Sequence, residues 1–251
     1  MSRKHVEVKG NILVVLLMLD LLIKCGGYST VPFLRHFVVH GLEARRPFTS
    51  MMRAEGMADG ATSRRRNSEL VGYKNTQKAV PIDRKMVVES TSLLLDILGV
   101  PDFKVDVWLC SESKIKQLND DWRGVNESTD ILSFPANDFI AAEVFDPTDP
   151  TLAFEKHLGD IVVAPNYVKR ACDNDQMLHE QGELNREEDK GCYKEMSHIF
   201  TVEDRLPMLL IHGLLHLLGH DHESEEEWLH MTSREIEVLQ KFRAARRSDT
   251  K

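Results

Sequence analysis

Three histidines near the C-terminal end of the chain have the spacing of ligands to one metal ion. His212 and His216 are four residues apart, and His222 follows six residues later. Because residues four apart on a helix lie on the same face, the first two imidazoles can point at one place. Gly219 can adopt the left-handed backbone conformation that ends a helix, after which the chain turns back and His222 can add a third nitrogen. Three histidine ligands with a fourth position left to water are typical of a catalytic zinc ion, so the sequence predicts one such ion per chain.

Two neighbours of the trio leave alternatives open. His220 lies two residues before His222 and could compete with it as the third ligand. We favour His222 because its spacing allows a full reversal of the chain after Gly219. Asp221 could also bind the metal, but an aspartate in this position more often orients a neighbouring histidine or caps the turn.

The spacing H-x-x-x-H-x-x-G-x-x-H is also that of the metzincin metalloendopeptidases. Those proteases need a glutamate directly after the first histidine, where it acts as the general base. In this chain the corresponding residue is Gly213, which has no side chain. Peptide hydrolysis by the metzincin mechanism is therefore disfavoured.

The histidines need a helix and a partner layer to hold them. The apolar run from Leu206 to Ile211 predicts a metal-binding helix from about Val202 or Glu203 to Leu218. A last amphipathic helix is predicted over residues 223–247, and it has an inner apolar stripe of Trp228, Met231, Ile236, Val238 and Leu239.

The preceding segments alternate between helical and strand patterns. Asp83 and Ser111 are each followed by a helical pattern and are predicted to cap those helices. The predicted elements are a helix over 83–98, a strand over 103–109, a helix over 111–122, strands over 131–134 and 159–164, and a helix over 166–178. Residues 136–155 are predicted to form a loop. The pattern indicates an α/β fold of the α+β type, with a small, mostly parallel or mixed sheet layered with helices, in which one strand pair could form a hairpin.

Charge divides the chain into two physically different segments. Residues 1–78 contain 13 Lys and Arg against 6 Asp and Glu, which leaves 19 against 34 for residues 79–251, so the net charges are +7 and −15. We therefore predict an N-terminal extension over 1–78 and a folded domain over 79–251, in which the polar segment 179–202 forms a surface insertion. The acidity of the domain argues against sequence-independent binding of nucleic acid through bulk charge, so such a role would need a local basic patch.

The N-terminal extension has the composition of a targeting segment. The apolar run from Ile12 to Leu19 is too short for a membrane span and resembles the hydrophobic region of a signal peptide. Residues 26–78 are rich in arginine and poor in acids, which is typical of a transit peptide. We expect import into a plastid or mitochondrion and no membrane span in the mature protein. The alternative is a disordered N-terminus without a targeting role.

The four cysteines are far apart in the sequence and form no C-x-x-C pair: Cys25, Cys110, Cys172 and Cys192. A disulfide framework is not expected at this size and density. We predict free thiols in a reducing compartment, with Cys110 in the core.

Three motifs together resemble the YbeY family of rRNA maturation factors and metal-dependent endoribonucleases. The histidine string from His212 to His222 is close to the family's H-G-x-L-H-L-x-G-Y-D-H, with His220 where tyrosine is usual. The segments 118–123 and 129–135 resemble L-N-x-x-x-R and T-D-V-L-S-F-P, and 158–162 matches L-G-D-I-V. The resemblance covers about residues 80–245 and leaves out the N-terminal extension and the 179–202 segment.

The resemblance implies a single α/β domain that cleaves single-stranded RNA, with one zinc ion held by His212, His216 and His222. In this family the activity serves the processing of the small-subunit rRNA 3′ end and ribosome quality control. Arg123 falls on the family's arginine implicated in activity, and we predict catalytic roles for Arg123 and His216. In our hypothesis a water at the zinc or a 2′-hydroxyl of the RNA attacks phosphorus while Arg123 holds the phosphate. The group that activates the nucleophile stays open.

Two other functions compete with this prediction. The chain could be a zinc-dependent hydrolase of peptides or small molecules. It could also be a non-catalytic ribosome assembly factor, with a structural metal, that binds a ribosomal protein or an assembly GTPase. The acidity of residues 79–251 favours a basic partner such as a ribosomal protein.

Overall fold

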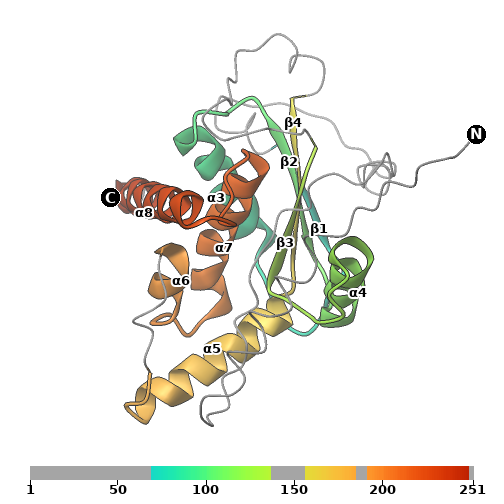
Figure 1. Ribbon diagram of the computed structural model, residues 1–251. Coiled ribbons are helices and arrows are strands. Elements are labelled where there is room, and N and C mark those ends of the chain that lie inside the picture. The colour runs from blue at the N-terminus through green and yellow to red at the C-terminus, as the bar shows by residue number, and fades with distance from the viewer. Residues whose placement is uncertain (1–68, 137–155, 185–190, 249–251) are drawn as a thin grey trace, which may run out of the picture. The chain divides into compact units, whose positions relative to one another are not determined.

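The fold is described from a computed structural model, in residues 69–136, 156–184 and 191–248 (Figure 1). The apolar run, Cys25 and nearly all of the predicted targeting extension lie outside the described residues, as does the predicted loop after residue 136. Within the described part of the chain, no helix is both long and apolar enough to cross a membrane.

In the part of the chain that the structure describes, four strands form one mixed sheet. They are β1 (Val71–Asn75), β2 (Lys104–Leu109), β3 (Ile131–Pro135) and β4 (His157–Val163), in the order β1-β2-β4-β3. Strands β1, β2 and β4 are parallel to one another, and β3 is antiparallel to its neighbour β4. The prediction of a small mixed sheet is confirmed, and the antiparallel pair is β3 with β4.

Strand β1 shows that the predicted start of the folded domain at residue 79 is too late. Val71 pairs with Val105 in β2 and is buried, with 5% of its surface exposed. The sequence Val-Gly-Tyr-Lys-Asn has too few apolar residues for its strand pattern to be recognised, and its pairing with β2 stabilises it. A side chain at Gly72 would overlap the Asp106 carboxylate, because a Cβ there would lie 1.7 Å from Asp106 Oδ1.

Six helices surround the sheet in the described residues. Their bounds are α3 (Arg84–Ile97), α4 (Glu112–Arg123), α5 (Pro165–Glu180), α6 (Gly191–Met196), α7 (Val202–Leu217) and α8 (Glu225–Ser248). The two predicted caps are confirmed: the Asp83 carboxylate accepts the Lys85 N–H at 2.9 Å, and the Ser111 hydroxyl accepts the Lys114 N–H at 3.3 Å.

The helices form two layers of unequal size. Helix α7 packs on one face of the sheet against β3 and β4, with α3, α6 and α8 around it, whereas α4 covers the opposite face (Figure 1). Every residue of α7 from Arg205 to its end is buried. Cys110, Cys172 and Cys192 are free thiols, and Cys110 is buried, as predicted; Cys172 and Cys192 are buried as well.

The prediction that residues 179–202 form a surface insertion is wrong for α6. Cys192 is fully buried and Met196 is 4% exposed, and both belong to the main core. A helix of six residues is too short to show an apolar period, so the sequence pattern did not reveal it.

The inner stripe of α8 is only partly as predicted. Met231, Val238 and Leu239 are buried, but Trp228 and Ile236 are half-buried. The remaining buried positions are Glu235 and Phe242.

Candidate metal centre

The ends of α7 are set by residues close in sequence. The Thr201 hydroxyl caps the first turn by accepting the Asp204 N–H at 3.3 Å. At the other end Gly219 has φ +87°, its N–H donates to the His216 carbonyl, and the His220 N–H donates to the Leu215 carbonyl. These two bonds and the left-handed glycine make a Schellman motif, which reverses the chain directly after the second histidine.

Gly213 lets α7 approach the sheet closely. A Cβ at this position would lie 3.0 Å from Ile131 Cδ1 and 3.1 Å from both Ile161 Cδ1 and Ser133 Oγ. The position that holds the glutamate base in metzincins therefore faces β3 and β4 and has no room for a long side chain. This packing is the physical reason why the metzincin mechanism does not fit this chain.

The structure brings the three predicted histidines together. One potential ligand atom from each of His212, His216 and His222 lies within 4.8 Å of the others. The Nε2 atoms of His212 and His216 are 3.1 Å apart. Two nitrogens bound tetrahedrally to one zinc ion at its usual bond length would be roughly 3.3 Å apart. The spacing thus fits a shared ion with little rearrangement.

Hydrogen bonds on the far side of each ring determine which nitrogen carries the lone pair. His216 Nδ1 is 2.9 Å from the His220 carbonyl oxygen, and since a carbonyl only accepts, Nδ1–H must donate. His212 Nδ1 donates to Glu235 Oε1 at 2.6 Å. Both Nε2 atoms therefore point lone pairs at the same place. Two facing lone pairs repel each other unless a cation lies between them, so the donor set fits a metal ion.

Glu235 is the site residue that sequence analysis missed. It is 4% exposed, its Oε1 accepts from His212, and its Oε2 accepts the Cys192 N–H at 2.9 Å. A glutamate on the buried stripe of an amphipathic helix, four residues after Met231, was the available signal. A carboxylate in such a position needs a buried partner, and here the partner is a candidate metal ligand.

His222 is the half-buried member of the trio. Its ring centre lies 5.6 Å from that of His212 and 5.0 Å from that of His216. Asp221 Oδ1 accepts the His222 N–H at 2.8 Å, so Asp221 caps the turn. His220 contributes its backbone carbonyl, and burial, followed by the nearby Arg234, lowers the pKa of its imidazole to about 4.

Helix α6 also contacts the site. The Tyr193 ring meets the His212 ring edge to face, with ring centres 5.4 Å apart and an interplanar angle of 86°. The Tyr193 hydroxyl donates to Asp130 Oδ2 at 3.3 Å, just before β3. Burial, followed by the charge of Asp130, raises the pKa of Tyr193 well above its usual range, so the phenol stays protonated.

Arg123 lies in a different layer from the histidines. It is the last residue of α4, on the opposite face of the sheet from α7. Its Nη1 donates to Asn119 Oδ1 at 2.8 Å, and Asn119 Nδ2 donates to the Glu127 carbonyl. Burial lowers the pKa of Arg123, yet a guanidinium remains charged. Asn119 thus fixes its orientation, and the catalytic role of Arg123 stays a prediction.

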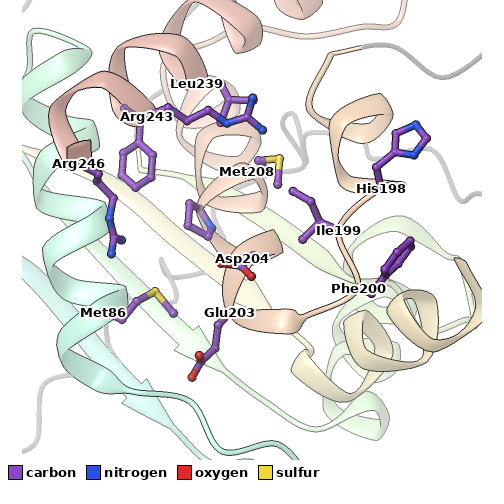
Figure 2. Close-up of a pocket in the computed structure, with 12 residues that line it drawn as sticks. Met86, His198, Ile199, Phe200, Glu203, Asp204, Met208, Leu239, Arg243 and Arg246 are labelled. Atoms are coloured by element: carbon purple, nitrogen blue, oxygen red, sulfur yellow. The ribbon is translucent and has the colours of Figure 1, made fainter. Parts of the chain in front are cut away.

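A cavity of about 610 Å³ lies away from the histidines, between α3, the start of α7 and the end of α8 (Figure 2). Its walls carry charges of both signs, from Glu203, Asp204, Arg243 and Arg246. Arg243 is paired with Glu195 at 2.9 Å. The histidines lie near the other end of α7, so the size of this cavity does not identify the chemical site.

Comparisons with known proteins find relatives over much of this chain. The family model described as endoribonuclease YbeY matches residues 72–188 and 187–243. Proteins named endoribonuclease YbeY from Persephonella marina, Shouchella clausii and Thermus thermophilus are 32%, 34% and 33% identical. These alignments cover 65%, 55% and 54% of this chain and 86%, 72% and 73% of the relatives. The solution structure of a Thermotoga maritima protein is 25% identical, with a TM-score of 0.36, over 70% of this chain and 93% of that one. Because the family model matches more than half of this chain, the chain belongs to the YbeY endoribonuclease family.

Proposed function

We propose that this protein is a zinc-dependent endoribonuclease that cuts single-stranded RNA and matures ribosomal RNA, including the 3′ end of the small-subunit RNA. The observation that carries the proposal is the convergence of His212 and His216, whose Nε2 lone pairs face each other at 3.1 Å beside His222. Membership of the YbeY family and the names of its relatives support RNA as the substrate.

The residues of the chain have separate tasks in this proposal. His212, His216 and His222 would hold the ion, and Glu235 would keep His212 in the tautomer that presents Nε2. A zinc ion held there would supply a Lewis acid for a phosphoryl oxygen and lower the pKa of water. Arg123 would bind a phosphate of the RNA through its guanidinium, which Asn119 holds in place.

Cleavage of defined RNAs tests the activity. The full chain with Zn²⁺ should cut a single-stranded RNA and leave the same RNA intact when it is annealed to its complement. His216→Ala should lose zinc binding and cleavage together, whereas His179→Ala, an exposed histidine on α5, should retain both. Full activity in the His216→Ala protein would contradict the metal site.

The cellular role needs a separate measurement. In cells that lack this protein, mapping should show extended or heterogeneous 3′ ends of the small-subunit rRNA. Unchanged ends would contradict the rRNA assignment while leaving nuclease activity itself open to the RNA assay.

A second candidate function is supported by charge. The net charge of −15 over residues 79–251 suits a basic partner such as a ribosomal protein better than it suits RNA. A non-catalytic assembly factor would use the metal only for stability. It would be favoured if chelation unfolded the domain while histidine variants still restored ribosome assembly in cells.

We further propose that the N-terminal extension directs the protein to a plastid or mitochondrion. The excess of arginine over acids in residues 26–78 supports this proposal. Residues 1–68, which precede β1, should localise to one of these organelles when fused to a fluorescent protein. A diffuse distribution of the fusion would contradict the targeting role.

A further inference from the structure

Helix α6 lies just after the point where the two segments matched by the family model meet. The family model matches this chain in two segments that meet at residues 187 and 188, directly before α6 at Gly191–Met196. The helix lies beside α7 and α8 (Figure 1), which carry the candidate ligands and Glu235. Helix α6 lies within the second matched segment, and it brings to the metal site residues that belong to none of the three family motifs.

The first contact of α6 is with the carboxylate of Glu235, which accepts the hydrogen bond from His212 Nδ1. The Cys192 N–H donates to Glu235 Oε2 at 2.9 Å, while Oε1 accepts from His212 at 2.6 Å. Gly191 makes this approach possible, since it has φ +60° and a Cβ there would lie 2.0 Å from Glu235 Oε2. Each carboxylate oxygen thus has its own donor, from α7 and from α6, so that the carboxylate cannot turn without losing one of them.

The second contact is with the ligand ring itself. Tyr193 packs edge to face against the His212 imidazole, and its hydroxyl donates to Asp130 Oδ2. Asp130 is held in turn, because its Oδ1 accepts the Ile131 N–H at 2.9 Å. Tyr193 therefore connects Asp130, the residue directly before β3, to the first ligand of the trio.

Separate interactions anchor α6 in place. Cys192 and Met196 are buried in the core, and Glu195 forms an ion pair with Arg243 of α8 at 2.9 Å. A support that is itself anchored can restrict the ring of His212, whereas a mobile cover cannot.

We infer that Tyr193 and the Gly191–Cys192 backbone are positioning groups of the metal site, which hold His212 and Glu235 in the orientation that binds the ion. This inference rests on the proposed metal site and deepens it. The residues from 191 to 196 thereby set the affinity of this chain for its metal. Groups behind metal ligands commonly change metal affinity roughly 10- to 100-fold, and α6 supplies two of them.

Two substitutions of Tyr193 separate its ring from its hydroxyl. Tyr193→Phe keeps the ring against His212 and loses the bond to Asp130, so we expect zinc affinity to fall by roughly 3- to 5-fold. Tyr193→Leu removes both contacts and should weaken binding by roughly 10-fold or more. Affinity is measured on the full chain by competition with a fluorescent zinc chelator. Tyr73→Leu, at a half-buried tyrosine of β1, is the matched control and should bind as the wild type does.

Two further readouts distinguish positioning from simple packing. The visible absorption of the Co²⁺-loaded protein reports ligand geometry, and it should change in Tyr193→Phe, where the ring and the fold are kept. Gly191→Ala should also weaken zinc binding, because the added Cβ displaces Glu235 Oε2. The thermal midpoint of each metal-free protein shows whether the variant is folded.

Different outcomes would contradict the role of α6 and the metal site itself. Tyr193 variants with lower thermal midpoints but wild-type zinc affinity and an unchanged Co²⁺ spectrum would show that α6 only covers the core, and the inference would be overturned. A wild-type protein that binds neither Zn²⁺ nor Co²⁺ would overturn the metal site itself. If Tyr193→Leu does not fold, Tyr193→Phe alone decides through its affinity and spectrum.

Discussion

The orientation of the His212 ring depends most directly on Glu235, whose carboxylate accepts its hydrogen bond. It accepts from His212 at 2.6 Å in a position that is 4% exposed, where a hydrogen bond to a charged acceptor is strong. An ionised carboxylate there makes the imidazole a better electron donor and keeps its Nε2 free of a proton. At the scale of single residues, the site therefore consists of three histidines and the groups that fix their tautomers.

Glu235→Gln is expected to weaken zinc binding by about 10- to 100-fold. Glutamine has nearly the same shape, but it has no charge and can turn a donor toward His212. Chelator competition measures the loss. Glu237→Gln, two residues away in an ion pair with Lys241 at 2.6 Å, should bind zinc as the wild type does. Equal affinity of Glu235→Gln and the wild type would show that Glu235 does not support the ligand.

At the scale of elements, the site depends on how closely α7 lies to β3 and β4. Gly213 faces that contact and His212, its neighbour, faces Glu235 on α8. The same helix thus uses one side for packing on the sheet and another for the ligands. The parallel pairing of β2 with β4 has a further consequence, since it sets Asp106 directly beside Asp160.

Gly213→Glu should destabilise the fold by roughly 3 kcal/mol or more, because a carboxylate would be buried between α7 and the sheet without a partner. It should not create a protease. Gly213→Ala is the control, since its Cβ needs only small shifts of the ends of Ile131 and Ile161. Urea denaturation measures the free energy of unfolding of both variants. A stable Gly213→Glu protein with peptidase activity would contradict this account of the packing.

Asp160 should make stability depend on pH between about 4 and 6. Burial, followed by the charge of Asp106, raises its pKa to about 6, against an unfolded value of about 3.9. The folded state therefore binds the proton more tightly. Asp160 contributes most to the free energy of unfolding below pH 4, where it is protonated in both states. This contribution is lost as the pH rises from about 4 to about 6, and it stays lost at higher pH. The full change is roughly 2 to 3 kcal/mol.

Asp160→Asn tests this dependence by removing the charge. The variant should be more stable than the wild type above pH 6, and the difference should shrink as the pH falls to 4. Asp102→Asn, at an exposed aspartate paired with Lys156, should show no such trend. Parallel stability curves for Asp160→Asn and the wild type across this range would show that the raised pKa is wrong.

At the scale of the whole molecule, two of the three candidate ligands lie in α7, which is buried along most of its length, so that metal binding is linked to folding. The trio forms only when α7, its C-terminal turn and α8 are all in place. An ion that binds only the folded state stabilises it by about 2.7 kcal/mol at 100 times its Kd. For a domain of this size that corresponds to a thermal shift of roughly 5 to 10 °C.

Adding Zn²⁺ to the metal-free chain should raise the thermal midpoint by roughly 5 to 10 °C, and excess chelator should reverse the shift. His216→Ala should show no zinc-dependent shift. Differential scanning calorimetry at several zinc concentrations measures it. A midpoint that does not respond to zinc in the wild-type protein would argue against a site that binds the ion in the folded state.

Local patterns were sufficient to predict the skeleton of the site. The four-residue spacing of His212 and His216, the reversal at Gly219 and the caps at Asp83 and Ser111 depend on residues within one or two turns of each other. Such interactions can be read from sequence because the geometry of a helix fixes the distances. The small mixed sheet was predicted in the same way, from the local strand patterns and from the expectation that one pair of strands forms a hairpin.

Only the tertiary structure decided what surrounds the histidines. Glu235 meets His212 across 23 residues and Tyr193 meets Asp130 across 63, and no spacing rule predicts either contact. Strand β1 and helix α6 were missed for the same reason, since each is short and is stabilised by partners far along the chain. The sequence by itself determined that three nitrogens could converge on one ion. The packing of α6 and α8 around His212 determined which of its nitrogens faces the ion and how firmly its ring is held.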